Sequence, residues 1–559
     1  MILPDQLRDL ISKSGFVVAA ELDAAIKTAG QLGKTLSDVL IYRGLINEEA
    51  LGTLIAQYYN VPPINLRNKT IPVEILNLIP EEAATTFRMI PFEVTDDEVH
   101  LAMEDPSDLE AREFAKRKTG KKLKIFCAAS ENLTQAFGQY KKNIKDVYTK
   151  IIQENLEKSK TAKDQDVTKL AQDLPVIRIL DTLLEYAAAE GASDIHFEST
   201  ETDFLVRFRI DGILQDTLTL TKSIHPAIVA RIKILAQLKI DEHRVPQDGR
   251  FKFKLKEEYI ALRVSILPAF HGENIVLRIL PESQRPLSLE ELGVVGHNLE
   301  LIKANIDKPH GMVLVTGPTG SGKTTTLYSI LTLLNTTEVN ICTIEDPVEY
   351  GIKRVNQTQV NPAAGLTFAA GLRALLRHDP NIIMVGEIRD GETANMAIQS
   401  ALTGHLVLST LHTNDAAGAI PRFLDMGAEG FLVASTVNIV IAQRLVRKIC
   451  SSCIEPFTPS VETLAYLKNY ASEAEIGQKF YRGKGCIECG NRGYKGRIGV
   501  YEILEVNEEI RRLIITKVSA EQIAQVGIKN GMVPLIRDGL NKASGGITTI
   551  EEVLRVMKE

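Results

Sequence analysis

One segment in the second half of the chain has residue types suited to holding phosphate groups. GPTGSGKTT, residues 317–325, satisfies the pattern G-x-x-x-x-G-K-[ST]. Its glycines allow backbone N–H groups to turn inward around an anion, and the start of the following helix adds its dipole. Lys323 supplies a positive charge to the outer phosphates, and the Thr324 hydroxyl can ligate magnesium. The predicted nucleotide-binding residues are Gly317, Pro318, Thr319, Gly320, Ser321, Gly322, Lys323, Thr324 and Thr325.

Three further segments end an apolar run in side chains that could act on a phosphate. ICTIEDPVEY (341–350) ends in three acids, NIIMVGE (381–387) ends in one, and HLVLSTLHT (405–413) contains an imidazole close to its end. A site with magnesium needs acidic groups beside the phosphates. The candidates for this chemistry are Glu345, Asp346, Glu349, Glu387 and His412.

The elements that would position these groups are short buried strands. Apolar runs such as Met312 to Thr316 and Ile382 to Val385 are typical of a buried strand, and a helix-forming run follows the glycine-rich segment. In open α/β sheets, ligands bind outside the carboxyl ends of the strands. We therefore expect four strands to bring their polar ends together at one edge of a sheet.

Four cysteines form a second pattern, in two C-x-x-C knuckles separated by residues 454–485. Each knuckle suits tetrahedral zinc ligation by thiolates. Disulfides are the alternative, which a cytosolic setting disfavours, and a redox pair would leave the other knuckle unexplained. We predict one structural zinc bound by Cys450, Cys453, Cys486 and Cys489, and expect Cys127 and Cys342 to be isolated buried thiols.

Composition limits the classes of function. The chain has 559 residues and a formal net charge of −6, which predicts roughly three to four domains. A mildly acidic chain has no global attraction to nucleic acid. The sequence shows neither an apolar run of the ~18 residues that a membrane span needs nor a signal-peptide pattern at its start. We therefore expect a cytosolic protein that reaches a membrane only through partners.

The chain divides into several predicted regions. Residues 1–140 form an N-terminal region, with a helical repeat in 1–60 whose Gly15 and Gly44 are equivalent, and a small α/β module in 61–140. A polar, charged stretch over 141–173 without Gly or Pro indicates a solvated helix or linker. A second α/β domain is expected over 174–288 and an ATPase domain over 289–559, with a zinc insert at 446–500 and C-terminal helices at 505–559.

The order GPTGSGKT, TIEDPVEY, DPNIIMVGEIRD, TGHLVLSTLHT resembles the ATPases of type II secretion and type IV pilus assembly. The four segments look like the Walker A, aspartate box, Walker B and histidine box of that family. The resemblance extends from about residue 174 to the C-terminus. It implies a RecA-like core preceded by a small PAS-like α/β domain, and the family often carries a tetracysteine insert.

The resemblance also implies roles for individual residues. Glu387 would hold a magnesium-bound water, and Glu349 would polarise the attacking water with support from Glu345 and Asp346. His412 would sense the γ-phosphate, and Thr403 belongs to the same box. In the preceding domain, Arg263 and Arg278 align with arginine fingers; the alternative is that they are ordinary exposed strand residues.

The family resemblance implies an ATP hydrolase that uses Mg²⁺ and works as a homo-hexamer. Its expected partners are an inner-membrane platform protein and a cytoplasmic docking protein, with the ring at the inner face of the cell membrane. Pilus extension is favoured over type II secretion, and a nucleic-acid motor or a non-catalytic scaffold is a weaker alternative. Residues 31–57 also resemble a cyclic-di-GMP-binding motif, although Gln31 stands where an arginine is usual.

Overall fold

The computed structural model describes residues 48–558, apart from 67–68, 160–170, 172, 256–257, 282–285 and 469–479, together with isolated positions before residue 48. Most of the predicted helical repeat, including about half of the cyclic-di-GMP-like segment, therefore lies outside the described residues. The contacts divide the chain into two units. One contains residues 1–154 with Cys450–Cys453 and Lys484–Gly493, and the other contains the rest.

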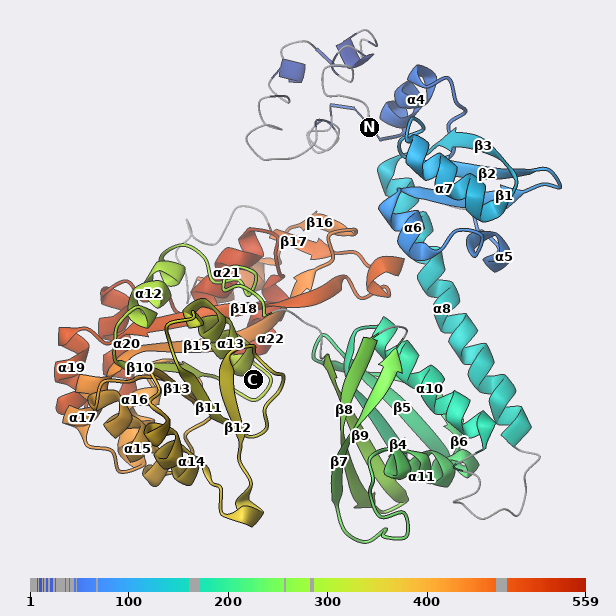
Figure 1. Cartoon of the computed structure of the whole chain (residues 1–559). Coiled ribbons are helices and arrows are strands. Elements are labelled where there is room, and N and C mark those ends of the chain that lie inside the picture. Colours follow the sequence, from blue (N-terminus) through green and yellow to red (C-terminus); the bar gives the residue numbers. More distant parts are fainter. Residues whose placement is uncertain are drawn as a thin grey trace. The chain divides into compact units, whose positions relative to one another are not determined.

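The N-terminal α/β module is built on a three-stranded sheet in the order β1-β2-β3 (Figure 1). β1 and β2 are antiparallel around a turn, and β3 runs parallel to β2. Helix α7 begins at an N-cap, Asp108, whose side chain accepts from the Ala111 N–H. The elements are α4 (Glu48–Tyr58), α5 (Val73–Leu76), α6 (Glu81–Thr86), β1 (Met89–Val94), β2 (Glu98–Met103), α7 (Leu109–Thr119) and β3 (Lys122–Cys127).

Helix α8 follows this module and runs over Ser130–Ser159, a length of 30 residues. It takes up the first part of the stretch that the sequence marks as a solvated helix or linker. Most of the remainder of that stretch, residues 160–170 and 172, lies outside the described residues.

A six-stranded antiparallel sheet follows, in the order β6-β5-β4-β9-β8-β7. Its strands alternate between buried aromatic or aliphatic side chains on one face and charged side chains on the other. Helices α10 and α11 contact each other and cover the apolar face (Figure 1). The elements are α10 (Leu174–Ala189), β4 (Ala192–Ser199), β5 (Asp203–Ile210), β6 (Ile213–Thr221), α11 (His225–Leu235), β7 (Gln247–Leu255), β8 (Glu258–Ala269) and β9 (Gly272–Pro281).

A seven-stranded sheet in the order β12-β11-β13-β14-β10-β15-β18 forms the core of the C-terminal half. All neighbouring pairs are parallel except β15 and β18. The central strands β10, β13 and β14 are buried along their whole length, which is why they read as continuous apolar runs. The strands are β10 (Gly311–Thr316), β11 (Ile341–Glu345), β12 (Val355–Gln359), β13 (Ile382–Val385), β14 (Leu406–Leu411), β15 (Val437–Ile449) and β18 (Tyr494–Glu505).

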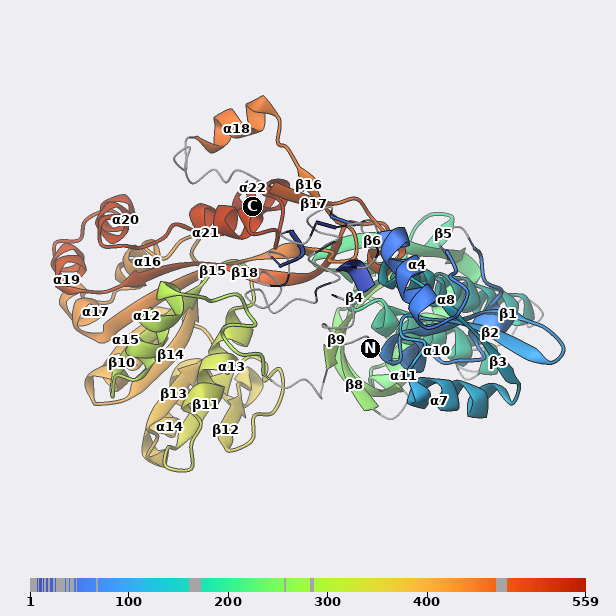
Figure 2. The same ribbon diagram turned by 90° about the horizontal axis from the view of Figure 1, so that it is seen from above.

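Helices pack on this sheet, and two hydrophobic clusters fill the space around it. The C-terminal helices lie along β15 and β18, where Glu552 pairs with Arg447 at 2.8 Å (Figure 2). The helices are α12 (His297–Ile306), α13 (Lys323–Leu334), α14 (Phe368–Leu375), α15 (Gly391–Leu402), α16 (Ala419–Asp425), α17 (Gly430–Thr436), α19 (Glu508–Ile515), α20 (Ala520–Lys529), α21 (Leu535–Ser544) and α22 (Ile550–Lys558). Between β15 and β18 lie β16 (Ile454–Phe457), α18 (Val461–Leu467) and β17 (Phe480–Gly483), with β16 and β17 paired antiparallel.

Candidate nucleotide site and metal centre

The glycine-rich segment forms a tight loop between β10 and α13. Gly317 and Gly322 have positive φ angles of 145° and 89°, a backbone region that favours glycine. A Cβ on Gly317 would meet the Gln443 carbonyl oxygen at 2.4 Å. Because Gly322 is also the N-cap of α13, the unbonded N–H groups of the first helical turn lie at the loop. The geometry fits an anion such as a phosphate.

Two polar side chains of the loop, those of Lys323 and Ser321, are suited to binding phosphate. The Lys323 Nζ donates to the carbonyl oxygens of Gly317 at 2.9 Å and Pro318 at 3.1 Å. Burial lowers the pKa of Lys323 to about 8, while the charge of Glu387 acts in the opposite direction. The Ser321 Oγ is buried and has no hydrogen-bond partner among the described residues. A desolvated ammonium and an unpaired hydroxyl beside a helix start suit a phosphate ligand.

The sheet order brings the four predicted strand ends together. β11, β13, β14 and β10 are consecutive neighbours and all run parallel, so their carboxyl ends share one edge. Glu387, just past β13, is mostly buried, and its Oε2 lies 3.3 Å from His412 Nε2, just past β14. Arg389, which the sequence analysis did not single out, contacts the same oxygen through its Nε at 2.6 Å.

The three acids of the segment after β11 have different surroundings. Glu345 is buried and accepts hydrogen bonds from the Tyr328 and Thr343 hydroxyls and from Gln357. Glu349 is half-buried, and its backbone N–H donates to the Tyr328 hydroxyl at 3.4 Å. Asp346 is exposed. Glu345 is therefore held by a buried network, whereas the other two carboxylates are not tied to it.

The pKa of Glu349 reflects two opposing effects. Burial raises it, and the guanidinium charges of Arg278 and Arg263 lower it. Both arginines belong to the outer face of the six-stranded sheet, where Arg263 on β8 lies opposite Arg278 on β9. A partly desolvated carboxylate near two cations can stay charged while remaining a stronger base than an exposed one.

One residue outside the predicted set holds Arg278 in place. Asp194 on β4 lies opposite Arg278, accepts from its Nε at 2.9 Å and is almost fully buried. The Arg278 side chain itself is 55% exposed, so its terminal nitrogens remain accessible. Strand alternation could have placed Asp194 on the charged face, but only the register shows its partner.

Thr403 lies apart from the other predicted residues. It ends α15, where its hydroxyl donates to the carbonyl oxygens of Gln399 and Ser400, both at 3.0 Å. Thr403 precedes β14 and His412 follows it, so the strand separates them. The histidine box is therefore divided between the two ends of one strand, and only His412 lies at the edge with the phosphate loop.

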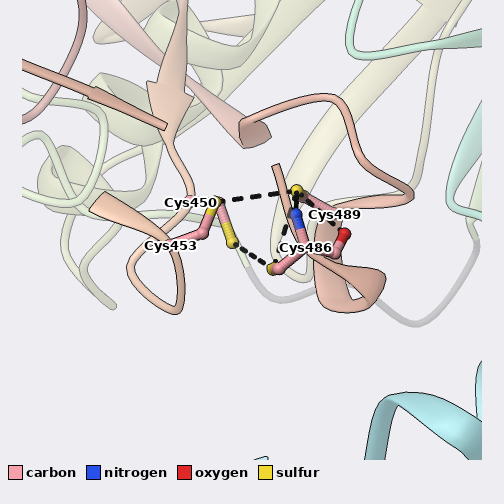
Figure 3. Close-up of side chains that lie close together, drawn as sticks. All are labelled: Cys450, Cys453, Cys486 and Cys489. Carbon is pink, nitrogen blue, oxygen red and sulfur yellow. Dashed lines mark hydrogen bonds between the residues drawn. The ribbon is translucent and has the colours of Figure 1, made fainter. Parts of the chain in front are cut away.

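The four knuckle cysteines meet in one cluster (Figure 3). Their sulfur atoms lie within 4.8 Å of one another, with contacts of 3.7 to 3.9 Å. Tetrahedral zinc with ~2.3 Å bonds would separate its sulfur ligands by roughly 3.8 Å. The residues therefore fit a structural zinc. The remaining two cysteines, Cys127 and Cys342, are buried free thiols, as the sequence predicts.

Backbone donors in this cluster favour thiolate ligands. The N–H groups of Cys486 and Gly493 each donate to the Cys489 Sγ at 3.2 Å. Burial alone would raise the pKa of Cys489, but these donors outweigh it and lower the pKa to about 7. Burial raises the pKa of Cys486 to about 11, so a bound cation is needed to hold all four sulfurs deprotonated.

A profile of the type II/IV secretion system protein family matches residues 169–555, more than half of the chain. The chain belongs to this family. A profile of the MshEN domain matches residues 59–146, which begin just after the cyclic-di-GMP-like segment. The predictions of a secretion ATPase and of its α/β fold class are thereby confirmed.

Individual relatives of this secretion ATPase agree with the family. It is 39% identical over 558 residues to the type IV pilus assembly ATPase PilB of Myxococcus xanthus, covering 98% of each chain. It is 46% identical over 398 residues to the type II secretion system ATPase E of Vibrio cholerae, covering 71% of this chain and 78% of that one. The ATPase DotB of Legionella pneumophila shares the fold, with a TM-score of 0.51, 23% identity and coverage of 68% of this chain and 95% of that one.

None of the helices in the described ranges combines the length and apolar character needed to span a membrane.

Proposed function

We propose that this secretion ATPase hydrolyses ATP to drive the assembly of type IV pilin or pseudopilin filaments. The main support for filament assembly is the share of each chain that the similarity to its relatives covers. The pilus assembly relative aligns over 98% of both chains, whereas the type II secretion relative aligns over 71% of this one. The N-terminal region is thus part of the similarity to a pilus assembly ATPase.

In the proposed site, the phosphate loop from Gly317 to Thr325 binds the triphosphate of ATP. Lys323 exchanges its loop carbonyl partners for outer phosphate oxygens, and Thr324 offers its hydroxyl as a magnesium ligand. Magnesium, when bound, neutralises charge on the β- and γ-phosphates. Glu387 would hold the metal's water shell, and its contact with His412 keeps these two side chains together at the same edge of the sheet.

Glu349 is the proposed group that orients and deprotonates the attacking water. Two properties support this role for Glu349 over Glu345: burial raises its pKa, and its carboxylate lies outside the network around Tyr328. Glu345 and Asp346 support it, with Glu345 acting through the buried network that also holds the Glu349 backbone. Arg263 and Arg278 supply positive charge to the transferring phosphate. Phosphoryl transfer depends mainly on such positioning and charge neutralisation.

The proposed working form is a homo-hexamer that acts through an inner-membrane platform protein and a cytoplasmic docking protein. Motion of the arginine-bearing sheet against the ATPase core would couple hydrolysis to that platform. The cysteine cluster binds one structural zinc per chain. We expect no nucleic-acid partner, and the protein works in the cytoplasm at the inner face of the membrane. Cyclic-di-GMP binding by residues 31–57 stays a prediction from the sequence.

The test replaces Lys323 by alanine, both in the purified protein and in the chromosomal gene. We expect ATP turnover to be lost with an unchanged thermal midpoint, because the Lys323 side chain contacts only loop carbonyls. Lys353→Ala, an exposed lysine of the same domain, is the matched control. Normal turnover in the Lys323 variant would rule out the phosphate-loop assignment.

The same chromosomal variant separates the two cargo classes. Loss of surface pili, seen by electron microscopy, supports filament assembly of the pilus type. Type II secretion is the second candidate, because the type II secretion ATPase of Vibrio cholerae has the higher sequence identity, 46%, over the 71% of this chain that it matches. Intact pili with loss of secreted protein from the medium would assign the chain to that system instead.

A further inference from the structure

One row of charged side chains crosses the outer face of the six-stranded sheet. The register places Arg250 of β7 opposite Arg263 of β8, and Arg263 opposite Arg278 of β9. Asp194 of β4 continues the row, and Arg209 of β5 ends it. Three arginines thus occupy directly opposed positions on three neighbouring strands.

Such a row is unfavourable for the isolated sheet. Directly opposed residues of an antiparallel pair have Cβ atoms ~5 Å apart, and like charges there destabilise the pairing. The one acidic member, Asp194, bonds Arg278 and lies 3.7 Å from Arg209. The side chains of Arg250 and Arg263 have no hydrogen bond or ion pair with another described residue. The row therefore holds more positive charge than its own residues neutralise.

On β8 and β9 the charge is confined to this row, whereas on β7 it continues with Lys252 and Lys254. On the next row in one direction, the β8 and β9 positions are Ala261 and Leu280. In the other direction they are Ser265 and Val276. A surface that tracks a nucleic-acid strand would continue the positive charge along the strands. A single transverse row instead matches a short anion with several adjacent charges.

Two arginines of the row also lie near an acid of the nucleotide site. Arg278 and Arg263 both lie close enough to Glu349 to affect its ionisation. Arg250 is the next arginine beyond Arg263 and is exposed on the same face. Neighbouring guanidinium groups can each form a fork with oxygens of adjacent phosphates.

We propose that Arg250 is a third phosphate-binding arginine, which extends the pair Arg263 and Arg278 and contacts the triphosphate when the sheet closes on the ATPase core. The inference rests on the proposed ATPase function and adds a residue to its site. Phosphate binding gives the row the counter-charge that it lacks. The unfavourable register of three arginines is thus compensated only in the closed, nucleotide-bound state.

The experiment compares Arg250→Gln with Lys252→Gln in the full-length protein. Lys252 is on the same strand and face, but its partner is Ala261 and it lies outside the row. For Arg250→Gln we expect kcat to fall roughly 10- to 100-fold, the range for losing a hydrogen bond to a charged group. The Kd for ATP, measured with a fluorescent analogue, should change less than about threefold. Lys252→Gln should leave both quantities unchanged.

The thermal midpoint separates a functional from a structural role. Removing one of three adjacent like charges should leave the midpoint of Arg250→Gln equal to or above that of the wild type. Arg250→Lys, which keeps the charge but not the fork, should recover part of the lost kcat. Loss of kcat together with a lowered midpoint, without recovery in Arg250→Lys, would indicate a structural role and overturn the proposal.

Failure of this inference differs from failure of the proposed function. If Arg250→Gln hydrolyses ATP as fast as Lys252→Gln while Arg278→Ala loses turnover, Arg250 is not a phosphate-binding residue, and the proposed ATPase site is unaffected. If Lys323→Ala also retains turnover, the proposed function itself fails.

Discussion

Glu345 and Glu349 lie in the same short segment but differ in what their carboxylates can do. Glu345 accepts from Tyr328, Thr343 and Gln357 inside the core, so both of its oxygens are engaged in holding the fold. Glu349 keeps a free carboxylate with a pKa raised by burial. At the scale of single residues, the choice of catalytic base therefore depends on which carboxylate the network leaves free.

We expect Glu349→Gln to bind ATP normally and to lose roughly 10²- to 10⁴-fold in turnover, the usual contribution of a general base. Glu345→Gln should instead lower the free energy of unfolding by about 1–3 kcal/mol, because the new amide cannot accept all three hydrogen bonds. Steady-state turnover measures the first effect and thermal unfolding measures the second. Glu338→Gln, at an exposed position, is the control. Wild-type turnover in Glu349→Gln would move the base role elsewhere.

Lys323 predicts a pH dependence of nucleotide binding. Burial lowers its pKa to about 8 in the free protein, and bound phosphates would raise it again. Binding at pH 8.5 should therefore take up protons, and affinity should decrease as the pH rises above about 8. At pH 6.5 the lysine is already charged, so proton uptake through it should vanish.

Calorimetry in two buffers of different ionisation enthalpy measures this uptake directly. Lys323→Arg is the matched control, because an arginine stays charged throughout the range and should show no uptake. Equal binding enthalpies in both buffers at pH 8.5 for the wild type would contradict the shifted pKa.

At the scale of elements, the two knuckles enclose a small hairpin. Cys450 and Cys453 directly precede β16, and β17 leads to Cys486 and Cys489. Joining the knuckles through one metal closes this segment at its base. Since no residue of the phosphate loop or of the strand ends lies between them, a zinc bound here would hold the insert and would take no part in the proposed hydrolysis.

We expect one zinc per chain in protein purified without chelator, measured by plasma mass spectrometry. Cys489→Ser should lose most of the metal and lower the thermal midpoint, because metal binding is coupled to folding of its site. ATP affinity should be unchanged. Cys342→Ala, a buried thiol away from the cluster, should keep its zinc. Wild-type protein without zinc would refute the metal centre.

At the scale of the whole molecule, the proposed catalysis requires residues from two sheets. The phosphate loop and the acids belong to the seven-stranded sheet, and the arginines belong to the six-stranded sheet. Both hydrophobic clusters of the ATPase core lie within residues 289–557. The core therefore has the apolar contacts needed to fold without the arginine-bearing sheet.

A fragment over residues 287–559 should bind ATP with the affinity of the full chain. Its turnover should be lower by about 10³-fold or more, because arginine fingers can contribute 10³ to 10⁵ in rate. The full-length Arg278→Ala variant is the comparison. It should also keep its affinity for ATP and lose turnover. Undiminished hydrolysis by the fragment would exclude the two-sheet mechanism.

Features that depend on residues close together in the chain, or on distinctive residue types, were predictable from the sequence alone. Continuous apolar runs identified the parallel strands, the glycine and lysine spacing identified the phosphate loop, and the paired cysteines identified the metal cluster. In each case the residues that act together are adjacent in sequence, or have a residue type that few other roles require. Local periodicity and side-chain chemistry are sufficient for such features.

Only the tertiary structure decided which distant residues meet. It placed Thr403 and His412 at opposite ends of β14, held Glu345 inside a network with Tyr328, and set Asp194 against Arg278. Strand register depends on long-range pairing, and a shift of one residue would turn every side chain to the other face. Because the alternating pattern of a strand shows its face but not its partner, the row from Arg250 to Arg209 could be recognised only in the folded sheet.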